Sequence, residues 1–130
     1  MAQRAFRIVL AEDDRFLRKA TETTLRRHGF TVYSAADGEE ALRLSRDEKP
    51  DAILLDMIMP KLQGFEVLRT LKADPDTARI PIIVLSNLGQ EEDKLGALEC
   101  GAAAYFIKAD LSLQNLVAQV ERVLEERPAQ

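Results

Sequence analysis

The stretch Ala52-Ile53-Leu54-Leu55-Asp56-Met57-Ile58-Met59-Pro60 decides the fold of this chain. Its four apolar residues in a row, after Pro50-Asp51, predict a short strand buried on both faces, as in the interior of a parallel sheet. Asp56 follows this run directly and therefore stands at the carboxyl end of the strand, where ligands bind in open α/β sheets. Asp is also a common cap or turn residue after a strand, so this stretch alone leaves that alternative open.

Further β-forming stretches lie on both sides of this one, and helical patterns separate them. The expected strands are residues 6–11, 31–35, 51–56, 82–85 and 104–107. The expected helices run from Asp14 to about His28, from Asp37 to about Asp47, through Phe65 to Asp74, from Gln90 to Cys100, and onward from Ser112. Gly29 and Gly101 end two of these helices, because glycine readily takes the left-handed conformation that follows a helix.

Two of the helices carry signals at their start. Asp14 occupies the position of an N-cap, and Asp37 with Glu40 three residues later resembles a capping box. The spacing of the first helix predicts an inner face made by Leu17, Ala20, Thr24 and Leu25.

The alternation of strand and helix predicts the topology. Right-handed βαβ crossovers give a parallel sheet with helices on both faces. We expect an α/β, doubly wound, five-stranded parallel sheet of flavodoxin-like order 2-1-3-4-5 with five helices. A barrel of this kind would need eight such units. Residues 1–130 are expected to form a single domain with a core from about residue 6 to 126.

The composition is that of an ordinary globular domain, with 46% hydrophobic and 31% charged residues. A formal net charge of -4 argues against broad binding to nucleic acid or to anionic membranes. No apolar run approaches the roughly 18 residues that span a bilayer. The single cysteine, Cys100, fits a reducing compartment. We therefore expect a cytoplasmic protein with neither nucleic-acid nor membrane partners.

Side chains able to do chemistry follow four of the five expected strands. Glu12-Asp13 follow the first, Asp56 ends the third, Ser86 follows the fourth and Lys108 follows the fifth. In the order 2-1-3-4-5 the first and third strands are neighbours, so the three carboxylates converge. They repel one another unless a cation sits among them, and such oxygen ligands suit Mg²⁺.

These groups together predict a site that handles phosphoryl groups. Asp56 is the expected nucleophile, because a carboxylate can form an acyl phosphate. Lys108 can supply a further positive charge, and Ser86 a hydroxyl that bonds a phosphoryl oxygen. Each residue alone has an ordinary structural explanation; their common position at carboxyl ends of strands is what favours a site.

The chain resembles the receiver domain of bacterial two-component response regulators, of the single-domain, chemotaxis-regulator kind, over nearly its whole length. The matching pieces are Ile8-Val9-Leu10-Ala11-Glu12-Asp13-Asp14, Leu54-Leu55-Asp56-Met57-Ile58-Met59-Pro60 with Gly64, Val84-Leu85-Ser86, and Gly101-Ala102-Ala103-Ala104-Tyr105-Phe106-Ile107-Lys108.

The resemblance implies that Asp56 accepts a phosphoryl group from a histidine kinase or a phosphotransfer protein. It implies that Glu12, Asp13, Asp56 and the Ile58 backbone carbonyl hold Mg²⁺, and that Ser86 and Lys108 contact the phosphoryl oxygens. Ser86 and Tyr105 would be the switch residues, with Tyr105 turning inward as Ser86 moves. Output would pass to a protein target through the fourth helix, fifth strand and fifth helix, from a monomer or weak dimer.

Two positions depart from the family pattern. Ala109 stands where proline usually follows the lysine, and Asn87 stands where a small residue usually follows the serine or threonine. A non-proline cis peptide costs about 2.5–4 kcal/mol, so a trans Lys108–Ala109 bond is expected. Asn87 is expected to crowd the pocket without removing a chemical group.

Other functions stay open alongside a switch that catalyses only its own phosphorylation and dephosphorylation. The chain could be a receiver cut from a longer regulator. An aspartyl-nucleophile phosphatase of the haloacid-dehalogenase type would need a second Asp two residues after the nucleophile, where this sequence has Ile58. A flavin-binding module would need a hydroxyl- and glycine-rich loop where Glu12-Asp13-Asp14 stand.

Overall fold

The computed structural model describes residues 5–59, 61, 63–87 and 89–126, which alternate strictly between strand and helix. The strands are β1 (Arg7–Ala11), β2 (Thr31–Ala35), β3 (Ala52–Asp56), β4 (Ile82–Ser86) and β5 (Ala104–Ile107). The helices are α1 (Arg15–Arg27), α2 (Gly38–Glu48), α3 (Gly64–Ala73), α4 (Glu91–Glu99) and α5 (Leu113–Glu126). A short 3₁₀ turn, η1 (Lys108–Asp110), joins β5 to α5.

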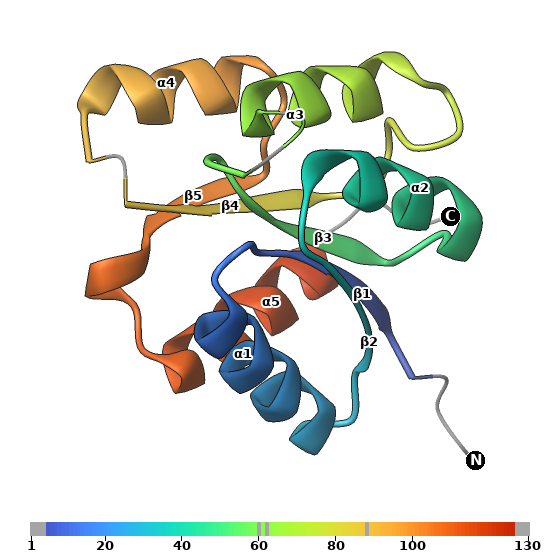
Figure 1. Cartoon of the computed structure of the whole chain (residues 1–130), viewed down its shortest axis with the longest axis vertical. Coiled ribbons are helices and arrows are strands. Elements are labelled where there is room, and N and C mark those ends of the chain that lie inside the picture. The colour runs from blue at the N-terminus through green and yellow to red at the C-terminus, as the bar shows by residue number, and fades with distance from the viewer. Residues whose placement is uncertain (1–4, 60, 62, 88, 127–130) are drawn as a thin grey trace.

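The five strands form one parallel sheet in the order β2-β1-β3-β4-β5, which confirms the predicted topology. The helices cover both faces: α2, α3 and α4 lie on one side of the sheet, and α1 and α5 lie on the other (Figure 1). All five strands point the same way, so their carboxyl ends share one edge of the sheet.

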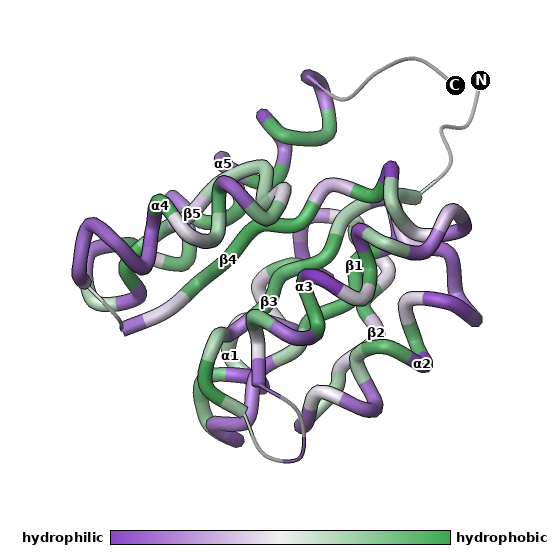
Figure 2. The backbone as a smooth tube through the Cα atoms, turned by 90° about the horizontal axis from the view of Figure 1, so that it is seen from above, coloured by the Kyte–Doolittle hydropathy of each residue, from purple (hydrophilic) through white to green (hydrophobic). Residues whose placement is uncertain are grey.

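Side chains of the central strands alternate between two cores, because successive residues of a strand face opposite ways. Val9, Ile53 and Leu55 face α2 and α3, whereas Ile8, Leu10 and Leu54 face α1 and α5. The hydrophobic residues follow the strands through the middle of the molecule and the hydrophilic ones lie on the outer helices (Figure 2). β3 and β4 are buried along their full length, as the unbroken apolar runs predict.

The first helix is capped as predicted, but the prediction of its buried face was partly wrong. The Asp14 side chain accepts a hydrogen bond from the Leu17 backbone N–H at 3.0 Å. Thr21 and Leu25 are the buried residues of α1, whereas Ala20 is exposed. Four-residue steps from Leu17 place Thr21 and Leu25 on one line along the helix, so the polar threonine, not the apolar alanine, faces the sheet.

One edge of the sheet is covered by side chains of α1. Arg26 Nη2 donates to the backbone carbonyl of Val32 in β2 at 3.0 Å, and Arg26 Nη1 lies 2.6 Å from Glu22 Oε1. The Ser34 hydroxyl donates to the other oxygen of Glu22 at 2.6 Å. These contacts join α1 to the outer side of β2.

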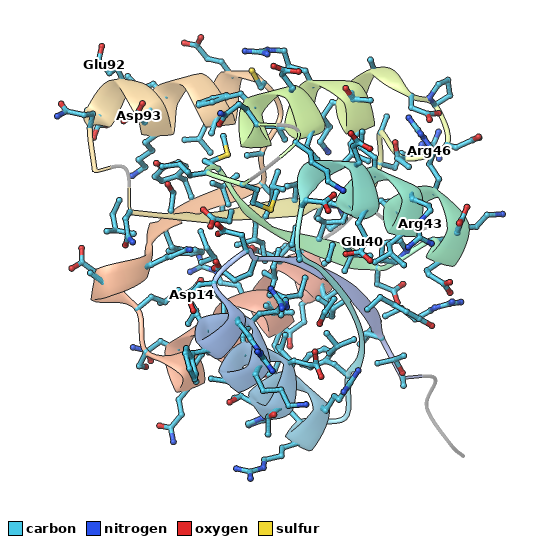
Figure 3. The ribbon with its side chains drawn as sticks, viewed as in Figure 1. Asp14, Glu40, Arg43, Arg46, Glu92 and Asp93 are labelled. Carbon is cyan, nitrogen blue, oxygen red and sulfur yellow. The ribbon has the colours of Figure 1, made fainter. Side chains whose placement is uncertain are left out.

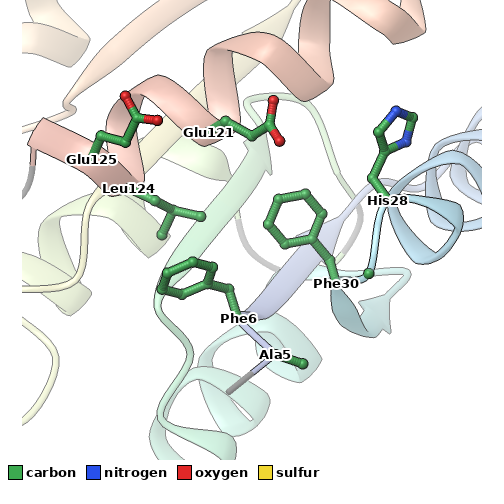
Figure 4. A pocket seen from close by; sticks show the side chains of 8 residues that line it. Ala5, Phe6, His28, Phe30, Glu121, Leu124 and Glu125 are labelled. Carbon is green, nitrogen blue, oxygen red and sulfur yellow. The ribbon is translucent and has the colours of Figure 1, made fainter. Parts of the chain in front are cut away.

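A hollow of about 440 Å³ lies at the amino-terminal edge of the sheet, opposite the predicted site. Phe6, Phe30 and Leu124 give it an apolar wall, and His28 and Glu121 stand beside it (Figure 4). No helix in the described part of the chain combines the length and apolar character needed to cross a membrane.

Candidate metal and phosphoryl site

The carboxyl edge of the sheet brings together the acidic residues that the sequence singled out. Glu12 follows β1 and Asp56 ends β3, and these two strands are hydrogen-bonded neighbours. Asp14, at the start of α1, marks this edge on the left of Figure 3, and the first turn of α4 with Glu92 and Asp93 lies at the same edge. The convergence predicted from strand order is confirmed for Glu12, Asp13 and Asp56.

Glu12, Asp13 and Asp56 each offer a carboxylate oxygen, and these oxygens all lie within 4.8 Å of one another. Glu12 is 3% exposed and Asp56 is 5% exposed, whereas Asp13 faces solvent. They line a hollow of about 360 Å³ that Asp14, Ile58, Asn87 and Lys108 complete. Two buried acids and one accessible acid thus share a cavity that opens to water.

Lys108 binds both buried carboxylates. Its Nζ lies 2.6 Å from Glu12 Oε1 and 2.9 Å from Asp56 Oδ2, and the side chain is 14% exposed. Burial lowers the pKa of Lys108, but hydrogen bonds to Glu12 and Asp56 outweigh that effect and raise its pKa above the ordinary value. The ammonium is therefore charged and joins the ends of β1, β3 and β5.

Glu12 is the carboxyl group most affected by its surroundings. Burial raises its pKa, and the hydrogen bonds from Lys108 and from the Asp14 backbone N–H only partly oppose that rise. The nearby charge of Asp56 adds to the rise. A further positive charge beside Glu12 would favour its ionised form.

The backbone around Asp56 is held by a close approach of α3. Gly64 N–H donates to the Met57 carbonyl at 3.0 Å. A Cβ at Gly64 would lie 2.4 Å from Met57 Cα and 2.8 Å from the Asp56 carbonyl oxygen, so only glycine fits there. Ile58 N–H donates to Asp56 Oδ1 at 3.2 Å, which orients the carboxylate toward the hollow. Gly64 and the Ile58 amide thus fix the position of the predicted nucleophile.

Ser86 and Tyr105 lie together on the neighbouring strands β4 and β5. Ser86, at the end of β4, is fully buried, and Tyr105 is 7% exposed. Burial raises the pKa of Tyr105, and a side-chain hydrogen bond with Ser86 opposes the rise. Tyr105 thus already holds the inward position that was expected only after phosphorylation.

The remaining site predictions have mixed outcomes. The described residues contain no cis peptide bond, which confirms the expected trans bond between Lys108 and Ala109. Asn87 is exposed and lines the hollow, and its crowding of the hollow stays a prediction. Ile58 also lines the hollow and is 53% exposed; the role of its carbonyl as a metal ligand stays a prediction.

Sequence reasoning missed the second contact of Lys108, to Glu12, and the role of Arg18. Arg18 Nη1 donates to the Glu12 carbonyl at 2.8 Å and to the Asp13 carbonyl at 3.3 Å. A signal for Arg18 was present: the first turn of α1 contains no acidic residue and places basic residues at the positive end of the helix dipole. A cation at that end of a helix is unfavourably placed, and for Arg18 the two loop carbonyls offset this.

The residues present fit a divalent cation. Three carboxylates and one ammonium leave a formal charge of about -2 in the cavity when all are ionised, which one divalent ion balances. The donors are hard oxygens, and the exposed side of Asp13 leaves room for water ligands. The acidic triad is thus consistent with the metal site of a receiver domain.

Known proteins resemble this chain over most of its length. The family described as "Response regulator receiver domain" matches residues 8–121. A "Probable transcriptional regulator ycf27" of Guillardia theta is 40% identical over 118 residues, which cover 91% of this chain and 45% of that protein. "Transcriptional regulatory protein PrrA" of Mycobacterium tuberculosis is 40% identical over 122 residues, with 93% and 51% covered. The chain spans about half the length of these relatives.

Solved structures of response regulators have the same fold as this chain. A Francisella response regulator receiver domain superposes with a TM-score of 0.87 at 28% identity and covers 95% of this chain and 99% of that one. The chemotaxis response regulator CheY4 of Vibrio cholerae gives a TM-score of 0.86 at 27% identity, with 92% and 99% covered. With the family match extending from β1 into α5, the chain belongs to the response regulator receiver domain family.

Proposed function

We propose that the chain is a phospho-accepting switch in which Asp56 takes a phosphoryl group from a histidine kinase or a phosphotransfer protein. An Asp56 oxygen forms the new bond to phosphorus as the bond between phosphorus and the donor nitrogen breaks. The observation that carries the proposal is the setting of Asp56. It lies in the open hollow with one oxygen beside Lys108, the other beside the Ile58 amide, and two acids next to it.

The neighbouring residues have distinct proposed roles. Glu12, Asp13, Asp56 and the Ile58 carbonyl would hold Mg²⁺, which when bound supplies positive charge against the phosphoryl oxygens. Lys108 would turn from the Asp56 carboxylate to a phosphoryl oxygen, because its ammonium is charged and already within bonding distance. The proposed role of Ser86 is to donate its hydroxyl to another phosphoryl oxygen.

Phosphorylation by a small donor tests the central assignment. Incubation with acetyl phosphate and Mg²⁺ should add one phosphoryl group, seen by intact-protein mass spectrometry. Asp56→Asn should abolish the addition, because the amide is a poor nucleophile, whereas Asp76→Asn, in an exposed turn after α3, should not. Equal phosphorylation of the Asp56 variant would assign the acceptor to another residue.

The Mg²⁺ ligands are tested by binding. Asp13→Asn should weaken Mg²⁺ binding because it removes a direct ligand charge. Asp47→Asn, an exposed residue of α2, makes the same chemical change away from the hollow and should leave the affinity unaltered. Unaltered affinity in the Asp13 variant would place the metal elsewhere.

The switch is proposed to act through the hydrogen bond between Ser86 and Tyr105. A serine hydroxyl has one proton to donate, so donating it to a phosphoryl oxygen changes its bond with the Tyr105 hydroxyl. That exchange would bias β5 and the neighbouring helices α4 and α5 toward a second arrangement. Because Tyr105 is already buried, the expected signal is a changed hydrogen bond rather than a large inward movement.

Chemical-shift mapping with beryllofluoride, which mimics the acyl phosphate, tests the switch. We expect changes at Tyr105 and along α4 and β5 as well as in the hollow. In the variant Tyr105→Phe, which lacks the hydroxyl, the changes around β5 should shrink while those at the hollow remain. Changes confined to the hollow in the wild type would mean that Tyr105 is only a core aromatic.

The phosphorylated state is proposed to be long-lived. Water must approach the phosphorus opposite the Asp56 oxygen. Two branched apolar residues, Ile58 two positions after Asp56 and Leu88 two positions after Ser86, are expected from the sequence to overhang that path. Ile58 does line the hollow, whereas Leu88 lies outside the described residues. Neither side chain can act as a general base, a function worth about 10²–10⁴-fold in rate. We expect the dephosphorylation rate to differ among wild type, Ile58→Asn, Leu88→Ala and the double variant. Equal rates in all four would show that these side chains do not control the approach of water.

The proposed switch also needs an output, either a domain of the same protein or a separate protein target. Receiver domains are typically signalling switches rather than enzymes, and the relatives above are longer transcriptional regulators by name. We propose output through protein contacts of this domain, whether within a longer regulator or with a separate partner. Mass spectrometry of the native gene product distinguishes those two forms.

A further inference from the structure

Arg18 holds two successive residues of the β1–α1 loop, Glu12 and Asp13, at once. Its Nη1 donates to the Glu12 carbonyl at 2.8 Å and to the Asp13 carbonyl at 3.3 Å. The side chain starts in the first turn of α1 and folds back toward the helix start. A charged donor on two successive carbonyls is a stronger restraint than one neutral hydrogen bond.

The same loop is held from its other side by its own acids. Glu12 Oε2 accepts from the Asp14 backbone N–H at 3.0 Å, and the Asp14 side chain caps α1 through Leu17 N–H at 3.0 Å. Between these two restraints Asp13 has an exposed side chain, so its direction depends on the backbone that carries it. Arg18 restrains that backbone at the Glu12 and Asp13 carbonyls, which lie on either side of the Asp13 Cα.

We infer that Arg18 is a positioning residue that aims Asp13 into the acidic hollow, and this rests on the proposed Mg²⁺-dependent function. Electrostatics and geometry make opposite demands here. A positive charge near a cation site weakens cation binding, so an Arg18 that acted only as a charge would oppose Mg²⁺. An Arg18 that aims Asp13 favours Mg²⁺. The sign of the effect of removing it therefore distinguishes the two roles.

The test compares two arginines of one helical turn. Arg18→Gln and Arg15→Gln each remove one positive charge from the first turn of α1, but the exposed Arg15 shows no side-chain hydrogen bond within the described residues. Mg²⁺ is titrated into the full chain and followed by amide chemical shifts of Glu12, Asp13 and Asp14. We expect Arg18→Gln to bind Mg²⁺ about 10-fold more weakly, as removal of a partner that orients a metal ligand does. Arg15→Gln should bind equally or slightly more tightly.

Arg18→Lys adds a graded variant. A lysine keeps the charge but presents a single ammonium in place of the planar fork of a guanidinium. We expect Mg²⁺ affinity between those of wild type and Arg18→Gln. If Arg18→Gln and Arg15→Gln both tighten binding, or both leave it unchanged, the inference is wrong while the proposed function stands. If Mg²⁺ causes no chemical-shift change at Asp13 in the wild type, both the proposed function and the inference are wrong.

A measurement without metal tests the geometry alone. The Asp14 N–H bond to Glu12 depends on the loop conformation that Arg18 holds. Hydrogen exchange at the Asp14 amide should accelerate in Arg18→Gln but not in Arg15→Gln, with amides of β3 unchanged in both. Unchanged protection of Asp14 in Arg18→Gln would contradict the inference even if Mg²⁺ affinity fell.

Discussion

Helices α1 and α4 both start at the edge of the sheet that carries the acidic hollow, yet they are held very differently. α1 has a side-chain cap at Asp14, and its buried residues Thr21 and Leu25 lie against the sheet and α5. Gln90, the residue just before α4, gives that helix no side-chain cap. Among its nine residues only Ala97 is buried, and Leu95 is 50% exposed.

The difference indicates which side of the molecule can respond. Elements with few buried contacts open at a lower free-energy cost than the rest of a domain. Glu12 and Asp13 lie between β1 and the well-packed α1, whereas Ser86 and Tyr105 lie on β4 and β5, and β5 contacts α4. We therefore expect a charge added at Asp56 to change the position of α4 more than that of α1.

The largest test of this comparison is a matched pair of truncations. Leu25→Ala in α1 removes a fully buried side chain and should lower the free energy of unfolding by about 2–5 kcal/mol. Leu95→Ala in α4 makes the same change at a half-exposed position and should stay within about 0.5 kcal/mol. Urea denaturation measures both. Comparable losses would mean that α4 is as firmly packed as α1.

Two glycines test packing by adding one methyl group. A Cβ at Gly96 in α4 would meet Phe65 Cε1 at an ordinary 3.5 Å, so Gly96→Ala should raise the free energy of unfolding by roughly 0.5–1 kcal/mol. Gly64→Ala has no such room beside Met57 and should lower it by about 1–3 kcal/mol. Destabilisation by Gly96→Ala would show that α4 is packed more tightly than the structure indicates.

The helix caps give a third pair. Asp14→Ala removes the bond to Leu17 N–H and should cost about 1 kcal/mol of stability. Gln90→Asp supplies α4 with the kind of cap that it lacks and should slow hydrogen exchange of the α4 amides while leaving those of α1 unchanged. Unaltered exchange in α4 would indicate that the helix is limited by packing, not by its start.

The smallest effect concerns pH and the outer side of α1. The hydrogen bond from Ser34, aided by the charges of Arg26 and Lys19, lowers the pKa of Glu22 below its ordinary value of 4.5, against the effect of burial. A carboxyl group with a lowered pKa stabilises the fold above its unfolded pKa, and the gain is lost as pH falls through the folded pKa. Wild type should therefore exceed Glu22→Gln in stability at pH 7, and the excess should shrink below pH 4.5. A difference independent of pH would assign the effect to packing alone.

Much of the fold was predictable because buried parallel strands are continuous apolar runs. β2 and β5 matched their predicted bounds, and β1, β3 and β4 differed by a single residue at one end. The inner face of α1 was less accurate, since Thr21 can lie inward as well as an alanine can and composition does not show which. The side of the helix that faces inward is set by its contacts with the sheet. The sequence of the helix alone does not show those contacts.

The site was predictable where a residue's position in a strand decided its place. Glu12, Asp13 and Asp56 converge because β1 and β3 are neighbours, a consequence of topology. Arg18 and the second contact of Lys108 depend on loop and side-chain conformations over a few ångströms. The early burial of Tyr105 likewise depends on packing with Ser86, which strand order does not determine.

The bond from Arg26 to Val32 has a consequence for the behaviour of the protein at high concentration. β2 is an edge strand, and the ladder to β1 uses Thr31 and Ala35, so the Val32 carbonyl points outward. An outward carbonyl on an edge strand can recruit a strand from another molecule and begin aggregation. Here the carbonyl is already taken by a guanidinium that Glu22 holds in place. A foreign strand would have to displace the Arg26 guanidinium from this carbonyl before it could extend the sheet at this edge.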